Sequence, residues 1–147
     1  WLHEKLGGTT TLASYGVDAS EERRLFNVHA DARKAVPHHH LRFLQDCEIS
    51  IFAGPLFFTH AGVRPGVALH DQAEDDLVWI RNEFSSDRRD HGALVVHGHT
   101  PVAAPLHAGN HVNLDTGAGF GKPLTTAVFE GTQVHVLTNQ GRQKLAP

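Results

Sequence analysis

The sequence predicts a mixed α/β domain with helices in the first part of the chain and strands in the second. Before Cys47, apolar residues recur three and four positions apart, as they do on one face of a helix. After Cys47 they gather in short runs bounded by glycine and proline, which is typical of strands joined by turns. The length of 147 residues suits one domain with a hydrophobic core.

The first 47 residues are expected to form helices separated by breaks. In the third of these helices we expect Leu41, Leu44 and Phe43 to turn inward, and we expect Cys47 to be half-buried. The predicted order is the end of a helix at 1–6, a loop at 9–16, a helix capped by Asp18 or Ser20, and a helix at 38–47.

The rest of the chain is predicted to be rich in strands, with one helix over residues 71–84. Two tight turns are expected, one at Ala53-Gly54-Pro55 and one at Gly131-Thr132, each joining two neighbouring strands into a hairpin. The predicted strands are 48–51, 56–59, 93–96, 111–114, 125–130 and 133–137.

Composition excludes several classes of protein. The 13 Lys and Arg against 16 Asp and Glu give a net charge of −3, and no basic stripe predicts nucleic-acid binding. No apolar run is long enough to predict a membrane-spanning helix. The single cysteine excludes an internal disulfide framework and is compatible with a reducing compartment, so we expect a cytoplasmic protein.

Two further features are unusual. The chain begins at Trp1 and contains no methionine, so we expect it to be part of a longer protein. It also contains 13 histidines, and we expect most of the ten other than His60, His97 and His99 to be solvated.

Two histidines stand where predicted strands end beside glycine. His60 follows the apolar run Leu56–Thr59, and His99 follows a strand through Gly98. Glycine allows close approach of backbone or ligand, and imidazole is a common metal ligand, so both are candidate ligands. Alternatively, His60 caps a strand end by hydrogen bonding, and only one of His97 and His99 is a ligand. His97 lies on the same predicted strand face as His99 and could be a ligand, a supporting residue or part of the core.

Arg81 is a candidate phosphate-binding residue, because the planar guanidinium can donate two hydrogen bonds to one phosphate at once. The alternative is a surface arginine paired with Glu83 or Asp76. Arg64 is a weaker candidate. The glycine-rich stretch 113–119 superficially suggests a phosphate cradle, but no Lys-Ser or Lys-Thr follows it, so a structural turn is favoured.

Taken in order, these motifs resemble the second half of a calcineurin-like metallophosphoesterase, and they are most similar to the bacterial and phage serine/threonine protein phosphatase branch. The resemblance extends over roughly residues 1–135. It rests on the stretches FFTHAGVRPG (57–66), DLVWIR (76–81), VHGHTP (96–101), NLDTGA (113–118) and LTTAV (124–128).

The resemblance implies a β-sandwich flanked by helices, of which residues 1–147 would be the C-terminal portion of a single domain. It implies two divalent metal ions in the complete enzyme, Mn with Fe or Zn as alternatives. His60 and His99 would be ligands of one ion, Arg81 would bind the substrate phosphate as a catalytic residue, and His97 would have a supporting role. The earlier family motifs GDxHG, GDxxDRG and GNHE do not occur in the sequence.

Three functions therefore remain open. The first is a phosphatase that acts on a phosphoprotein or a small phosphoester by a two-metal mechanism, for which this chain alone would be inactive. The second is a dinucleoside polyphosphate (diadenosine tetraphosphate) hydrolase. The third is a non-catalytic module that binds a metal or a partner. No nucleic-acid or membrane partner is expected under any of the three.

Overall fold

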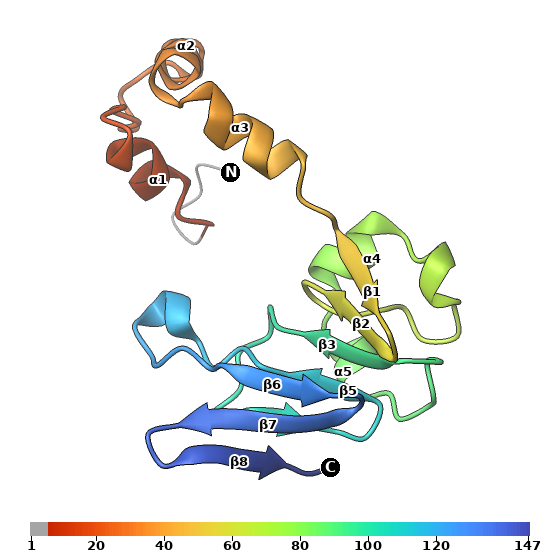
Figure 1. Ribbon diagram of the computed structural model, residues 1–147. Helices are drawn as coiled ribbons and strands as arrows, with labels where there is room; N and C mark the ends of the chain where they lie inside the picture. Colours follow the sequence, from red (N-terminus) through yellow and green to blue (C-terminus); the bar gives the residue numbers. More distant parts are fainter. Residues whose placement is uncertain (1–5) are drawn as a thin grey trace. The chain divides into compact units, whose positions relative to one another are not determined.

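The computed structural model describes residues 6–147, and the chain divides into two compact units at the Cys47–Glu48 boundary (Figure 1). The mixed α/β class predicted from the sequence is confirmed, with helices in the first unit and two sheets with helices in the second. The helix end predicted at 1–6 falls almost entirely outside the described residues. Within residues 6–147, no helix is both long enough and apolar enough to span a membrane.

The first unit consists of three helices: α1 (Gly8–Ser14), α2 (Leu25–Ala35) and α3 (His38–Gln45). The loop predicted at 9–16 is wrong, because α1 occupies most of it. Leu12 of α1 is buried with Val17 and Val28, and this packing outweighs the weak helix propensity of the three threonines in α1.

The predicted start of the second helix is also wrong. The Asp18 carboxylate accepts a hydrogen bond from the Ser20 backbone N–H at 2.9 Å, and this contact closes a local turn. The helix begins only at Leu25. Helix α3 is confirmed, but the inward orientation predicted for it is wrong. Leu41, Phe43 and Leu44 are 40%, 69% and 66% exposed, and Cys47 is exposed as well.

The second unit is built on a five-stranded sheet with the strand order β1-β2-β3-β5-β4. Strands β2, β3 and β5 are parallel, and the outer strands β1 and β4 pair antiparallel with β2 and β5. In this register Phe58 of β2 lies opposite Val96 of β3. The bounds are β1 Ser50–Ala53, β2 Leu56–Thr59, β3 Leu94–His97, β4 Leu106–His107 and β5 His111–Asn113.

Both faces of the central strands are buried, as expected for parallel strands. Phe57 and Val95 point to the face covered by residues 61–84, where they pack with Leu77, Ile80 and Phe84. The alternate residues of the same strands point to the opposite face. There Leu56, Leu94 and Val112 pack with Val134 of the second sheet.

The second sheet is a three-stranded antiparallel meander of β6 (Ala127–Glu130), β7 (Gln133–Thr138) and β8 (Gly141–Leu145). The two predicted hairpins are confirmed by the β1–β2 and β6–β7 pairs. Strands β4 and β8 were not predicted, since β4 has only two residues and β8 is largely polar. The complete sandwich arrangement of the family remains a prediction.

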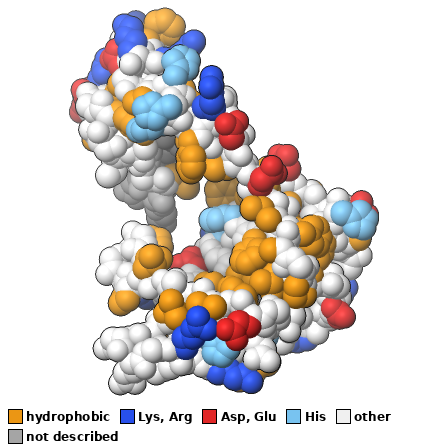
Figure 2. Space-filling view, viewed as in Figure 1, with side chains coloured by type: hydrophobic (Ala, Val, Ile, Leu, Met, Phe, Trp, Pro, Cys, Tyr) orange, Lys and Arg blue, Asp and Glu red, His pale blue; other side chains and the backbone are white. Residues whose placement is uncertain are grey.

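Strand β1 is an edge strand with an exposed apolar surface. Ile51 and Phe52 on the strand are 52% and 55% exposed, and Ile49 just before it is 40% exposed. Figure 2 shows apolar side chains gathered over this part of the second unit.

The single helix predicted over 71–84 is replaced by three short segments: a 3₁₀ turn (Leu69–Asp71), α4 (Glu74–Trp79) and α5 (Asn82–Ser85). The break falls at Ile80 and Arg81, where the backbone of Arg81 has φ −131° and ψ −108°. Ile80 is buried in the core while Trp79 is 58% exposed. At this break, the side chains of Trp79 and Arg81 are exposed to solvent.

Gly62 is required by close packing in the loop after β2. Its φ is +152°, and a Cβ placed there would overlap Cδ1 of Phe84, whose side chain is fully buried. Gly62→Ala should therefore lower the free energy of unfolding by roughly 1–3 kcal/mol through overpacking. Urea denaturation of the 147-residue chain measures this change.

Gly119→Ala is the matched control, because no atom lies within 4 Å of a Cβ at Gly119. Equal unfolding midpoints for the two variants would show that the loop adjusts without cost, which contradicts the packing argument.

Candidate functional site

The two histidines singled out in the sequence lie together at one edge of the five-stranded sheet. Strands β2 and β3 are parallel neighbours, so their carboxyl ends meet at the same edge. His60 follows β2 directly and His99 lies two residues after β3. The Nε2 atom of His60 is 3.0 Å from the Nδ1 atom of His99, and the ring centroids are 4.8 Å apart.

The turn that carries His99 is held in an unusual conformation. His99 has φ +66°, the one positive φ among the non-glycine residues that the structure describes. Such a conformation is uncommon for a side chain other than glycine, and it clusters at functional sites. The Nε2 atom of His99 is also buried, with no hydrogen-bond partner among residues 6–147. The positive φ makes this turn a candidate functional feature, and Nδ1 of His99 is the nitrogen that faces His60.

Backbone contacts fix the turn on both sides. The N–H of Gly98 donates to the carbonyl of His60 at 2.9 Å, which ties the two strand ends together. A Cβ at Gly98 would lie 3.1 Å from the Cβ of Asp115, so this position has little room for a side chain.

The electrostatic surroundings favour a neutral His99. Burial is the main cause that lowers the pKa of His99 below its ordinary value of 6.5, and the positive charge of Arg81 and the neighbouring His60 lower this pKa further. A neutral imidazole can offer a lone pair to a metal ion, whereas an imidazolium cannot.

Arg81 lies near His99 and forms no ion pair with the described residues. The sequence left open a pairing of Arg81 with Asp76 or Glu83. The structure instead pairs both acids with Arg64, at 2.7 Å from Nε to Asp76 and 2.8 Å from an Nη atom to Glu83. Within residues 6–147, no carboxylate oxygen lies within 4.0 Å of the Arg81 guanidinium.

Arg64, the weaker phosphate-binding candidate, forms ion pairs with two acids. It belongs to the loop that follows His60, and its guanidinium binds the Asp76 carboxylate with two donors. These contacts keep the pKa of Asp76 below its usual range and the pKa of Arg64 above its own. The two ion pairs join the loop after His60 to the segment that contains Arg81.

The glycine-rich stretch after β5 is a structural turn, as predicted. The Asn113 side chain donates to the carbonyl of Thr100 at 2.9 Å and accepts from the N–H of Asp115 at 2.9 Å. The Asp115 carboxylate in turn accepts from the N–H of Gly117 at 2.8 Å. These bonds connect the end of β5 to the turn that carries His99.

A layer of buried histidines lies in the core beneath the site. His91, His107 and His111 belong to the minority of the ten other histidines that are not solvated. His97 and His111 are 5% and 1% exposed, and both rings contact Phe84 with centroids 4.9 Å away. The strand residues Val96 and Val112 beside them are apolar, and the sequence alone does not show that the Asn110 side chain faces His111. Burial lowers the pKa of each to about 4.

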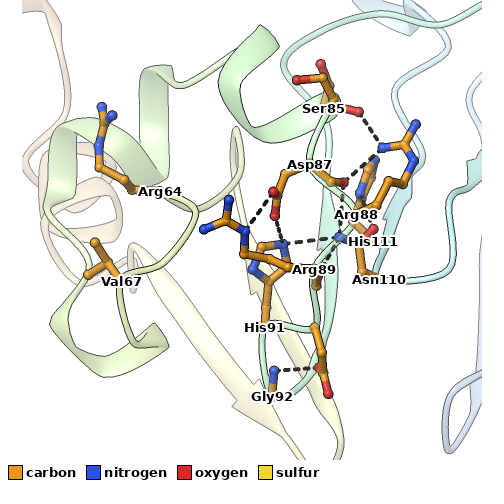
Figure 3. Close-up of polar contacts among 12 residues, drawn as sticks. Arg64, Val67, Ser85, Asp87, Arg88, Arg89, His91, Gly92, Asn110 and His111 are labelled. Carbon is orange, nitrogen blue, oxygen red and sulfur yellow. Dashed lines mark hydrogen bonds and ion pairs between the residues drawn. The ribbon is translucent and has the colours of Figure 1, made fainter.

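The outer end of this layer is held by a polar network around Asn110 (Figure 3). The Asn110 side-chain amide donates to the backbone carbonyls of Asp87 and Arg89, at 3.1 and 2.9 Å. Its oxygen lies 2.9 Å from Nδ1 of His111. The His91 Nε2 atom lies 3.6 Å from the Asp87 carboxylate, and its side chain is 3% exposed.

The donor set at the sheet edge fits part of a metal site. Two nitrogens on one ion with bonds of about 2.0–2.1 Å lie roughly 3.0–3.4 Å apart, and the His60–His99 separation of 3.0 Å falls in this range. The facing nitrogens can share one proton or offer both lone pairs to one cation. In the part of the chain that the structure describes, no group of three or more His, Cys, Asp or Glu side chains could hold a metal.

Comparison with known proteins gives two bacterial relatives, while no protein-family model matches. The asymmetrical bis(5′-nucleosyl)-tetraphosphatase PrpE of Bacillus subtilis strain 168 is 27% identical over 140 residues, covering 84% of this chain and 57% of that protein. The protein of the same name from Anoxybacillus flavithermus strain DSM 21510/WK1 is 58% identical over 86 residues, covering 49% of this chain and 35% of that protein.

The chain thus spans little more than half of one relative and about a third of the other. The names of the relatives agree with the broad class of phosphate-ester hydrolases that the motifs predicted. They do not support the serine/threonine phosphatase branch, which remains a prediction.

The buried histidine layer predicts a pH-dependent stability. The unfolded histidines have a pKa near 6.5 and bind more protons than folded His97 and His111 with pKa values of about 4. Stability is therefore lost as the pH falls from about 6.5 toward 4. The urea midpoint should decrease between pH 7 and pH 5, and His111→Phe should make this decrease smaller.

His70→Gln serves as the control, because the His70 side chain is 78% exposed. It should leave the pH dependence as in the unaltered chain. If His111→Phe and His70→Gln gave the same dependence on pH as the unaltered chain, His111 would not contribute.

Proposed function

We propose that this chain supplies one part of the active site of a metal-dependent phosphoesterase. One observation supports the proposal above all others: the facing nitrogens of His60 and His99, 3.0 Å apart at the ends of adjacent parallel strands. Arg81, which has no carboxylate partner among the described residues, lies close enough to His99 to lower its pKa. Two imidazole nitrogens beside a guanidinium without a carboxylate partner suit a metal ion and a phosphate.

Each residue has a definite task in this proposal. His60 and His99 would hold a divalent ion through the two nitrogens that face each other. When bound, divalent ions supply polarisation of the phosphoryl group and a nucleophilic water of lowered pKa. The Arg81 guanidinium would bind the phosphoryl oxygens and offset their charge as the bond to the leaving group breaks.

Mn²⁺ is the metal we propose, with Fe and Zn as alternatives. Imidazole nitrogens accept all three, and the carboxylates of the family motifs that this sequence lacks would favour Mn²⁺. Two imidazoles alone bind a divalent ion weakly, so the remaining ligands would come from outside residues 1–147.

For the substrate we favour a dinucleoside polyphosphate, because both relatives are named as bis(5′-nucleosyl)-tetraphosphatases. This was the second of the functions left open by the sequence. A phosphoprotein substrate is kept as the other candidate, since the motif order resembles the serine/threonine phosphatase branch.

The primary test compares hydrolysis by this chain and by the full-length protein that contains it. Both are incubated with Mn²⁺ and, in separate reactions, with diadenosine tetraphosphate and with phosphoserine. The proposal predicts activity of the full-length protein and none of the 147-residue chain. Absence of activity in both, with Mn²⁺, Fe²⁺ and Zn²⁺ each tried, would refute a phosphoesterase function.

His60→Ala or His99→Ala in the full-length protein should lower turnover by about a hundredfold or more, since each removes a ligand for the metal. Metal content should fall in parallel, while the circular dichroism spectrum remains that of the folded protein. His70→Ala, at an exposed position away from the strand ends, is the control. Activity within a few-fold of the unaltered protein would show that these histidines are not ligands.

Arg81→Ala should raise KM or lower kcat for phosphoesters by about ten- to hundredfold, because charge-assisted hydrogen bonds to the phosphate are lost. Metal content should not change. Arg81→Lys should recover only part of the loss, because lysine lacks the planar pair of donors. Arg142→Ala on β8, which removes a surface ion pair with Glu130, is the control. A loss of metal in Arg81→Ala would instead assign Arg81 a structural role.

A further inference from the structure

Trp79 is a large apolar side chain that remains exposed beside His99 of the histidine pair. It ends α4 and is 58% exposed, although Leu77 and Ile80 on either side are each only 6% exposed. Its ring lies perpendicular to the ring of His99, with the centroids 5.6 Å apart. An indole with this much accessible surface can accept another planar group against it.

The indole shares a hollow on the protein surface with the groups that would bind phosphate. Trp79, Arg81 and Asn82 line this hollow, together with Arg64, its partner acids and the carboxylate of Asp75. A molecule in the hollow would thus contact both the indole of Trp79 and the guanidinium of Arg81, which are two positions apart in the sequence. The histidine pair lies next to the same ring, through the contact between Trp79 and His99.

We propose that Trp79 is a stacking platform for a nucleobase of the substrate. The proposal rests on the phosphoesterase function proposed above and names the part of the substrate that the site recognises. A nucleotide has a phosphate chain at one end and a planar base at the other, which matches the sequence of charged and aromatic groups in the hollow. A phosphorylated serine or threonine offers no planar group for the indole.

Stacking on an aromatic ring tolerates any base, because every base presents a π face. The platform therefore selects nucleotides over base-free phosphoesters without selecting one base over another. We expect adenine and uracil dinucleotides to bind to this ring in the same way.

Tryptophan fluorescence gives a direct test, because the chain contains only Trp1 and Trp79. In Trp1→Phe, Trp79 is the only fluorophore of its type. This variant of the 147-residue chain is titrated with diadenosine tetraphosphate and, separately, with inorganic tripolyphosphate, both in EDTA so that no hydrolysis occurs. Stacking predicts saturable quenching by the dinucleotide and none by tripolyphosphate. No saturable quenching by the dinucleotide, or equal effects of the two ligands, would overturn the proposal.

Kinetics of the full-length protein give a second readout that a merely structural role would not produce. Trp79→Leu, which keeps an apolar side chain and removes the π face, should lower the ratio of kcat/KM for diadenosine tetraphosphate to that for phosphoserine by about tenfold. The change should lie in KM for the dinucleotide. Trp79→Phe, which keeps an aromatic face, should recover most of the ratio. An unchanged ratio in Trp79→Leu would refute the platform.

The experiments distinguish failure of the stacking platform from failure of the phosphoesterase function. Quenching by the dinucleotide without hydrolysis by the full-length protein would retain the platform and refute the phosphoesterase function. Hydrolysis of the dinucleotide with an unchanged ratio in Trp79→Leu would retain the function and refute the platform.

Discussion

The parallel pairing of β2 with β3 is the constraint on which the rest of the second unit depends. It places Phe58 opposite Val96, and both strands end one residue later at the same edge. His60 and His99, separated by 39 positions in the sequence, meet there. A slip of one residue would turn the apolar face of β3 toward the wrong layer. The hydrophobic layers on both faces of the sheet therefore fix the distance between the two imidazoles.

The same packing places histidines in the core. His111 on β5 lies opposite Val95 and packs against Phe84 with His97, and burial keeps both histidines neutral at ordinary pH. Asn110 binds the outermost of these rings and two backbone carbonyls of the loop that precedes β3. The layer beneath the strand ends is thus tightly packed and depends on pH for its stability.

Arg64 links the candidate site to the helices. By binding Asp76 and Glu83, it takes up the two acids that would otherwise compete for Arg81. The exposed ion pairs contribute little to stability in themselves. Their effect is one of specificity: a guanidinium is left available beside His99, and the chain break after Trp79 presents both side chains to solvent.

The sequence by itself determined the α/β class, the strands β2, β3, β5, β6 and β7, both hairpins, and the placement of His60 and His99 at strand ends. The alternation of apolar and polar residues and the positions of turn residues are local signals, so they can be recognised without knowledge of the fold. Tertiary structure decided the rest. The burial of His111, the pairing of Arg64, helix α1 and the break at Arg81 all depend on residues distant in sequence, because packing against a partner outweighs local propensity.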